Sequence, residues 1–257
     1  MPRVFVTTSW DDEDRSGLKV AELVSRLGLR GTFYVPTGRL AQGASFTTSD
    51  LQTLAGAGFE IGAHTVSHAI LTEVRPEELA REVGDCKETL QAIVGAEIGM
   101  FCYPKGRFNR EVTTAVERAG YRGARSTQML TSTTAFDRFA IPTTLQAYPH
   151  RRSNYVRNLV RLGAIDVLLQ SLPDLVRFQD WLRLGQVSFD RILRTGGVWH
   201  LYGHSWEIEK LGLWDELREM LEYVSGRSGV EYVTNGQLLD LVKGEVAARG
   251  ELVPTRP

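Results

Sequence analysis

The sequence predicts an α/β protein whose largely parallel strands form a distorted (β/α) barrel of about seven to eight strands. Strand-like runs alternate with helical patterns over most of the chain. Polar stretches follow several of these runs, at the strand ends where barrel enzymes carry their chemistry. No internal repeat of about 20–50 residues is visible, which excludes a solenoid or a propeller.

The first part of the chain supplies most of the regular pattern. Strands are predicted over 3–10, 31–36, 59–64 and 98–104. Helices are predicted over 16–29 with Ser16 as N-cap, over 48–58 with Ser49 or Asp50 as cap, over 75–95 and over 109–120. The helix over 75–95 is the clearest, because its apolar positions step by four, three, four and three residues. Cys86 lies on that apolar face and is expected in the core.

The second part is less regular. Strands are predicted over 121–126, 138–142, 196–204 and 230–234, with a helix over 214–224. Residues 143–195 are expected to form a helical insertion region within a single domain that spans residues 1–245. Residues 246–257 are expected to form a flexible C-terminal tail.

Composition fits one large globular domain, because 42% of the 257 residues are hydrophobic and 24% are charged. The formal net charge of −1 gives no indication of a nucleic-acid partner. No apolar run reaches about 18 residues, so no membrane span is expected. The N-terminal residues lack the pattern of a signal peptide, and two cysteines form no disulfide framework. We therefore expect a cytoplasmic protein.

Four short polar stretches carry the candidate chemistry. They are SWDDED (9–14), GAHTVSH (62–68), YPKGRFN (103–109) and GHSWE (203–207). Asp11 and Asp12 can serve one site only if the strand ends or bulges there, because adjacent strand residues face opposite sides. His64 and His68 would share one face of a helix, but they could equally lie in a loop. One aspartate and two histidines supply the three ligands of a catalytic zinc-type site.

Together these stretches resemble the NodB-type polysaccharide deacetylases, carbohydrate esterase family 4, over roughly residues 3–242. SWDD (9–12) is similar to the family motif TFDD, and HTVSH (64–68) to H-[ST]-x-x-H. CYPKG (102–106) is similar to RPPY-G, and LYGH (201–204) to L-x-H with one residue more. The resemblance implies a NodB-like barrel and a metal-dependent hydrolase.

The resemblance also implies a role for each matching residue. Asp12, His64 and His68 would bind a divalent metal ion, for which zinc is the expected choice. Asp11 would be the general base, and the backbone N–H of Lys105 would stabilise the oxyanion. His204 would protonate the leaving amine.

A second histidine lies on the same strand as His204. His200 sits about 13 Å deeper, so it is expected to be a hydrogen-bonded interior residue.

Two positions depart from the family pattern, and one family motif is unclear. Cys102 stands where the family has an arginine that orients the catalytic aspartate, and we expect it to be buried rather than nucleophilic. Lys105 stands where the family has a tyrosine. The fourth family motif is unclear, and Asp180 in QDW (179–181) is the best candidate for orienting the acid.

Substrate contacts are less strongly indicated. The candidates are Tyr103, Trp206, Arg151 and Arg152. The stretch HRRSNYVRNLVR (150–161), which also holds Arg157 and Arg161, fits a solvated helix face or subunit contact. It fits equally a rim that attracts a phosphate-bearing or acidic substrate.

The sequence thus predicts a metal-dependent amide hydrolase that removes an N-acetyl group from an amino sugar in a glycan or glycan precursor. Hydrolysis of a small cyclic amide or imide, as in allantoinase-like relatives, stays open because the family arginine is missing and because DDED (11–14) is dense in acidic residues. A catalytically inactive metal- or sugar-binding module is the third interpretation. The expected partner is an N-acetylated saccharide, and a homo-oligomer is left open.

Overall fold

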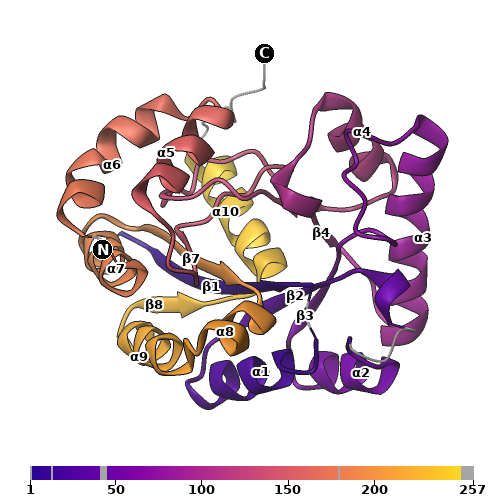
Figure 1. Cartoon of the computed structure of the whole chain (residues 1–257), viewed down its shortest axis with the longest axis horizontal. Helices are drawn as coiled ribbons and strands as arrows, with labels where there is room; N and C mark the ends of the chain where they lie inside the picture. The colour runs from indigo at the N-terminus through magenta and orange to yellow at the C-terminus, as the bar shows by residue number, and fades with distance from the viewer. Residues whose placement is uncertain (1, 13, 41–44, 179, 250–257) are drawn as a thin grey trace.

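In the computed structural model, one sheet of parallel strands curls into a partial barrel with helices packed outside it (Figure 1). The structure describes residues 2–12, 14–40, 45–178 and 180–249. The strand order is β5-β4-β3-β2-β1-β7-β6, and β8 pairs with β1. Each strand pair in this sheet is parallel. The predicted fold class, a distorted (β/α) barrel, is therefore confirmed.

The strands are short apart from the first and the seventh. They are β1 (Val4–Asp11), β2 (Gly31–Val35), β3 (Glu60–Ala63), β4 (Met100–Cys102), β5 (Gly123–Arg125), β6 (Leu145–Gln146), β7 (Gly197–Gly203) and β8 (Val230–Tyr232). The longer helices are α1 (Gly17–Arg26), α2 (Thr48–Gly56), α3 (Pro76–Val94), α4 (Arg110–Arg118), α5 (Arg152–Arg161), α6 (Ile165–Arg177), α7 (Trp181–Thr195), α9 (Trp214–Val224) and α10 (Asn235–Arg249). Three short helical segments complete the set: η1 (Thr37–Arg39), η2 (Pro104–Gly106) and α8 (Ser205–Leu211).

Strand β1 is the centre of the sheet, and its residues are buried throughout. It pairs with β7 along one edge. Along the other edge, β8 pairs with its first half and β2 with its second half. A strand buried on both faces reads as a near-continuous apolar run, which the segment VFVTTSW approximates. The carboxyl end of β1 thereby lies at the centre of one rim of the barrel.

The segment 138–146 bridges the gap between β5 and β7. Ile141 forms an isolated bridge with Arg125, and β6 then pairs with β7. The predicted strand over 138–142 is therefore wrong, and the strand lies at 145–146 instead. Pro142 offers no N–H to a ladder, and its carbonyl oxygen is 3.1 Å from Nδ1 of His200.

Other boundaries differ in detail. Helix α2 is capped by Thr47, whose side chain accepts from the N–H of Asp50 in a capping box, rather than by Ser49 or Asp50. Residues 143–195, expected as an insertion, include β6 within the sheet and α7, which packs on β7 and α9. Helix α10 continues to Arg249, so residues 246–249 of the expected tail are helical, whereas residues 250–257 lie outside the described part. No described helix is both long and apolar enough to cross a membrane.

Candidate active site

The rim formed by the strand ends holds a cavity of about 380 Å³. Six residues expected to act in catalysis or metal binding line it: Asp11, Asp12, His64, His68, Lys105 and His204. They come from the ends of β1, β3 and β7 and from the turn after β4. The parallel sheet brings these distant segments together because all its strands end on the same side.

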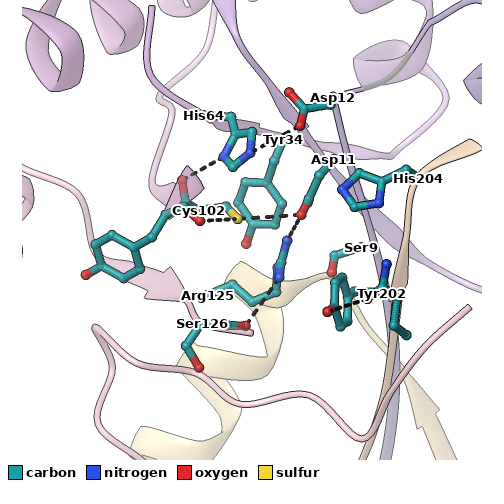
Figure 2. A network of polar contacts seen from close by, with 12 residues as sticks. Ser9, Asp11, Asp12, Tyr34, His64, Cys102, Arg125, Ser126, Tyr202 and His204 are labelled. Carbon is teal, nitrogen blue, oxygen red and sulfur yellow. Dashed lines mark hydrogen bonds and ion pairs between the residues drawn. The ribbon is translucent and has the colours of Figure 1, made fainter. Parts of the chain in front are cut away.

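Asp11 and Asp12 both face this cavity because the strand ends between them. Asp11 is the last residue of β1, and Asp12 has φ of +54°, a left-handed conformation. The strict alternation of strand side chains is broken at that point, as the sequence argument required. Figure 2 shows the two carboxylates pointing into the same space.

Asp12, His64 and His68 form a set suited to a divalent metal ion. Oδ2 of Asp12 is 3.0 Å from Nε2 of His68 and 3.9 Å from Nε2 of His64. Nδ1 of His64 lies 2.7 Å from the carbonyl oxygen of Cys102, which fixes the proton on Nδ1 and leaves the Nε2 lone pair free. Burial also lowers the pKa of His64, and the neutral imidazole is the form that binds metals. The donor set therefore fits the expected cofactor.

The two histidines lie in a loop, not on a helix. Thr65 and His68 have φ of +68° and +63°, so the chain turns sharply between the ligands. Glu82 of α3 holds the turn by accepting hydrogen bonds from the N–H groups of Val66 and Ser67, each at 2.9 Å. Its other oxygen accepts from the Ser67 hydroxyl at 2.7 Å. The loop geometry is thus set by a buried carboxylate from a neighbouring helix.

Asp11 is buried, and its two oxygens differ. Oδ2 accepts a hydrogen bond from Arg125 and lies 3.7 Å from Sγ of Cys102, whereas Oδ1 has no hydrogen-bond partner. Burial by itself raises the pKa of Asp11, but Arg125, His64 and His204 together outweigh it and lower the pKa below its usual value. Asp11 is therefore ionised at neutral pH and has one oxygen free to accept a proton.

Arg125 was not identified from the sequence. It lies on β5 directly opposite Cys102 of β4, so the two residues are register partners and reach the same oxygen of Asp11 (Figure 2). The guanidinium is fully buried and lies over the rings of Tyr34 and Tyr202, at 5.4 and 4.7 Å. An arginine among small residues in a predicted buried strand, GARS (123–126), was the available signal.

Cys102 itself is buried, as expected. Burial raises the pKa of its thiol well above the ordinary value. The protonated thiol is a poor nucleophile and a poor metal ligand. Its place beside Asp11 and His64 therefore indicates packing and hydrogen bonding.

His204 is oriented by a residue that the sequence argument did not select. Nδ1 of His204 is 2.7 Å from Oε2 of Glu207, three residues later in the chain. Burial lowers the pKa of His204, but the bond to Glu207 and the charges of the nearby carboxylates raise it above the ordinary value. Asp180 caps α7 instead, accepting from the N–H of Arg183 at 2.6 Å. The proposed role of Asp180 is therefore wrong.

His200 is a fully buried interior residue, as predicted. Its ring nitrogens lie 2.9 Å from the hydroxyl of Ser9 and 3.1 Å from the carbonyl oxygen of Pro142. Burial lowers the pKa of His200 to about 3, so it is neutral near pH 7.

The turn after β4 presents Lys105 to the cavity. Lys105 and Gly106 have φ of +54° and +61°, and a side chain on Gly106 would collide with Thr127. The carbonyl oxygen of Lys105 accepts a bond from Arg161 of α5 at 3.4 Å, which ties the turn to that helix.

The substrate-contact candidates divide into two groups. Tyr103 lines the cavity, although its hydroxyl is used in a bond to the carbonyl oxygen of Phe139 at 2.9 Å. Trp206 lies beside His204, with ring centroids 5.4 Å apart, but does not line the cavity. Arg151 and Arg152 do not line it either, and Arg152 donates to the carbonyl oxygen of Val176 on α6. Arg157 and Arg161 of the same stretch do line it.

Comparisons with known proteins concern the family and the fold. Residues 2–124 match the sequence profile of the polysaccharide deacetylase family. The curated Bacillus subtilis protein YxkH, whose name places it among polysaccharide deacetylases, is 24% identical over 100 residues, which are 39% of this chain and 36% of YxkH. The matched region thus spans about a third of that relative.

Solved structures show the same fold over nearly the whole chain. A Mycobacterium smegmatis protein named for the same family has a TM-score of 0.65 at 15% identity, covering 100% of this chain and 95% of its own. A family 4 acetyl xylan esterase from Clostridium thermocellum, solved with a cobalt ion, has a TM-score of 0.59 at 14% identity, covering 97% and 93%. The resemblance seen in the sequence is therefore confirmed: residues 2–124 match the polysaccharide deacetylase family, and the chain has the fold of solved structures named for that family and for family 4 esterases.

Proposed function

We propose that this protein is a metal-dependent hydrolase that removes the N-acetyl group from an amino sugar in a glycan or glycan precursor. The observation that carries the proposal is the convergence of three metal-ligand side chains, a free carboxylate oxygen and a carboxylate-paired histidine in one cavity. Kinship with deacetylases and an acetyl esterase supports an acetyl group as the part that is hydrolysed.

Asp12, His64 and His68 are the residues that would hold the metal ion. When bound, a divalent cation supplies a Lewis acid that polarises the acetyl carbonyl. Two imidazoles and one carboxylate form a donor set that would suit a catalytic zinc ion. The side chain of Arg39 donates to Oδ1 of Asp12 at 3.0 Å and orients that ligand.

The remaining steps belong to the chain's own side chains. Oδ1 of Asp11 accepts a proton from the attacking water as its oxygen bonds to the acetyl carbon. The N–H of Lys105 donates to the oxygen that gains negative charge. His204 then gives its proton to the sugar nitrogen as the C–N bond breaks, releasing acetate and a free amine.

The pairing of His204 with Glu207 favours an amide over an ester substrate. An amine leaves only when it is protonated, and Glu207 keeps His204 protonated at a higher pH than usual. An ester needs this proton less. Its leaving group is a sugar alkoxide, which is a much weaker base than the nitrogen anion that would leave from an unprotonated amide.

The two other interpretations lose support. Cyclic amide hydrolysis was kept because the family arginine is absent at position 102, but Arg125 now supplies a guanidinium to Asp11. An inactive binding module has no need for the buried Arg125–Asp11 pair, which is costly to desolvate, or for the partly buried His204–Glu207 pair.

The experiment compares acetate release from N-acetylglucosamine oligomers and from O-acetylated xylan, with ring opening of a cyclic imide as a third assay. Protein stripped with chelator and reloaded with zinc or cobalt is used throughout. We expect metal-dependent acetate release from N-acetyl substrates. Ring opening alone would replace the proposal, and zinc binding without any turnover would assign the chain to the inactive class.

A further inference from the structure

One wall of the cavity is cationic, and no reaction step uses its charges. Besides the metal ligands, the cavity is lined by Lys105 and by Arg157 and Arg161 of α5. Arg157 and Arg161 are four residues apart on one helix, so they present their guanidinium groups on the same face. The wall therefore gathers three positive charges within reach of one ligand.

Within the described part of the chain, no carboxylate forms an ion pair with these charges. The lining carboxylates are those of Asp11 and Asp12, which are already paired with Arg125 and with Arg39 and His68. Among the ion pairs of the described residues, none includes Lys105, Arg157 or Arg161.

The two arginines make few hydrogen bonds to neighbouring polar groups. Arg157 donates to the amide oxygen of Asn154 at 2.9 Å, on its own helix. Arg161 makes long bonds to the carbonyl of Lys105 and the hydroxyl of Thr127, at 3.4 and 3.3 Å. Most of their donors therefore remain available for a ligand.

We propose that this wall, built by Lys105, Arg157 and Arg161, binds a phosphate group of the substrate, so that the substrate is a phosphorylated N-acetyl amino sugar. The inference rests on the proposed deacetylase function and names its substrate class. Two guanidinium forks and an ammonium match the several oxygens and the charge of a phosphoryl group better than those of one carboxylate.

The phosphate could belong to a free sugar phosphate or to a lipid-linked sugar. Helices α5 and α6 (upper left in Figure 1) carry six of the exposed large apolar side chains of the described residues: Val156, Val160, Ile165, Leu169, Leu172 and Val176. An apolar surface beside a phosphate site is compatible with substrate presented from a lipid surface. The test separates the two sources.

The test measures kcat/KM for deacetylation of N-acetylglucosamine 1-phosphate and of the neutral methyl glycoside. Arg157→Gln is compared with Arg194→Gln, which makes the same charge change on the last turn of α7, at the other end of β7. We expect the parent and Arg194→Gln to prefer the phosphate. Arg157→Gln should lose about 10-fold or more on the phosphate only.

A binding measurement keeps the inference testable if neither sugar is hydrolysed. Titration of metal-free protein with pyrophosphate should show binding that Arg157→Gln weakens about 10-fold and Arg194→Gln leaves unchanged. Absence of turnover would then count against the proposed function, not against the phosphate site. Equal kcat/KM for both sugars would overturn the phosphate site. Equal pyrophosphate affinity of the parent and Arg157→Gln would also overturn it.

A third arm identifies the source of the phosphate. The same sugar linked by diphosphate to a polyprenol is presented in phosphatidylcholine vesicles to the parent and to Leu169→Asn/Val176→Asn. A lipid-linked substrate is assigned if this variant loses turnover on the vesicle-bound sugar but keeps its turnover on the soluble sugar phosphate. Equal turnover by both proteins, with the soluble sugar phosphate preferred, assigns a free one, and either result supports the phosphate site.

Discussion

Asp11 depends on a guanidinium that arrives from an unexpected strand. Cys102 occupies the sequence position that resembles the family arginine, and Arg125 is its register partner on β5. Both side chains touch Oδ2 of Asp11, and the short cysteine leaves room for the guanidinium. Arg125 thus supplies from the neighbouring strand the guanidinium contact that the resemblance implied for position 102.

Arg125→Met should leave a buried carboxylate without its counter-charge. The pKa of Asp11 should then rise, so that the acid limb of the kcat/KM profile moves to higher pH. Urea unfolding should show a loss of about 3–5 kcal/mol, because one partner of a buried ion pair has been removed.

The exchange of the two residues, Cys102→Arg with Arg125→Cys, provides the control. It should recover much of the activity and the original acid limb, whereas Cys102→Arg alone should destabilise by placing two guanidinium groups on one carboxylate. An exchange variant as impaired as Arg125→Met would contradict the interpretation that the arginine has moved between strands.

Asp11 and Asp12 should separate in their effects. Asp11→Asn should retain zinc and lower kcat by about 10²–10⁴, because it removes only the base. Asp12→Asn should weaken zinc binding itself. Elemental analysis after dialysis, together with kcat at saturating zinc, tests this division, and identical metal content with identical kcat in the two variants would refute it.

Glu207→Gln should shift the alkaline limb of kcat/KM to lower pH. The carboxylate raises the pKa of His204, and His204 acts in its protonated form. Without the negative charge, the proton is lost at a lower pH, while the bond to Nδ1 can persist through the amide oxygen. An unchanged limb would mean that His204 is not the acid or that Glu207 does not control it.

At the scale of elements, helix α3 shapes the metal-binding loop. Glu82 accepts two backbone N–H groups and one hydroxyl from residues 66 and 67, which lie between the ligands. The histidines are therefore positioned by a helical residue, Glu82, that lies more than a dozen residues after His68 in the chain.

Glu82→Ala should lower zinc affinity about 10–100-fold while leaving the fold intact, because the turn loses its acceptor. Competition with a chromophoric chelator measures the affinity. Glu88→Ala, on an exposed position of the same helix, is the matched control and should bind zinc like the parent. Equal affinity in both variants would show that the loop holds its own shape.

At the scale of the whole molecule, His200 links parts of the barrel that close around the site. It contacts Ser9 of β1 and the segment before β6 from its position on β7. The pKa of His200 is about 3 in the folded protein and near 6.5 when the side chain is exposed. Between these two pH values, His200 is therefore protonated in the unfolded chain but neutral in the folded protein.

Stability should therefore fall as pH decreases below about 6.5, by up to about 1.4 kcal/mol per pH unit from this residue. His200→Asn should be less stable at pH 8 but should show a shallower loss between pH 6.5 and 4. Urea midpoints across this range measure both slopes, and parallel curves for the two proteins would contradict the assignment.

Local sequence signals determined much of the fold and the core of the site. The pattern of apolar residues located β1, β2, β3 and helix α3. In each of these elements, the buried positions follow a regular spacing within one short segment of sequence. The aspartate pair, the two histidines and His204 were identified because each follows a strand in a short motif.

The tertiary structure alone decided which distant side chains complete that site. Arg125, Glu82 and the cationic wall of α5 act across the barrel, and no local pattern states which strand or helix will face another. Glu207 lay three residues from His204, but only the turn into α8 showed that it reaches the ring. Short motifs encode the groups that react, whereas the register and packing of the sheet determine the charges that surround them.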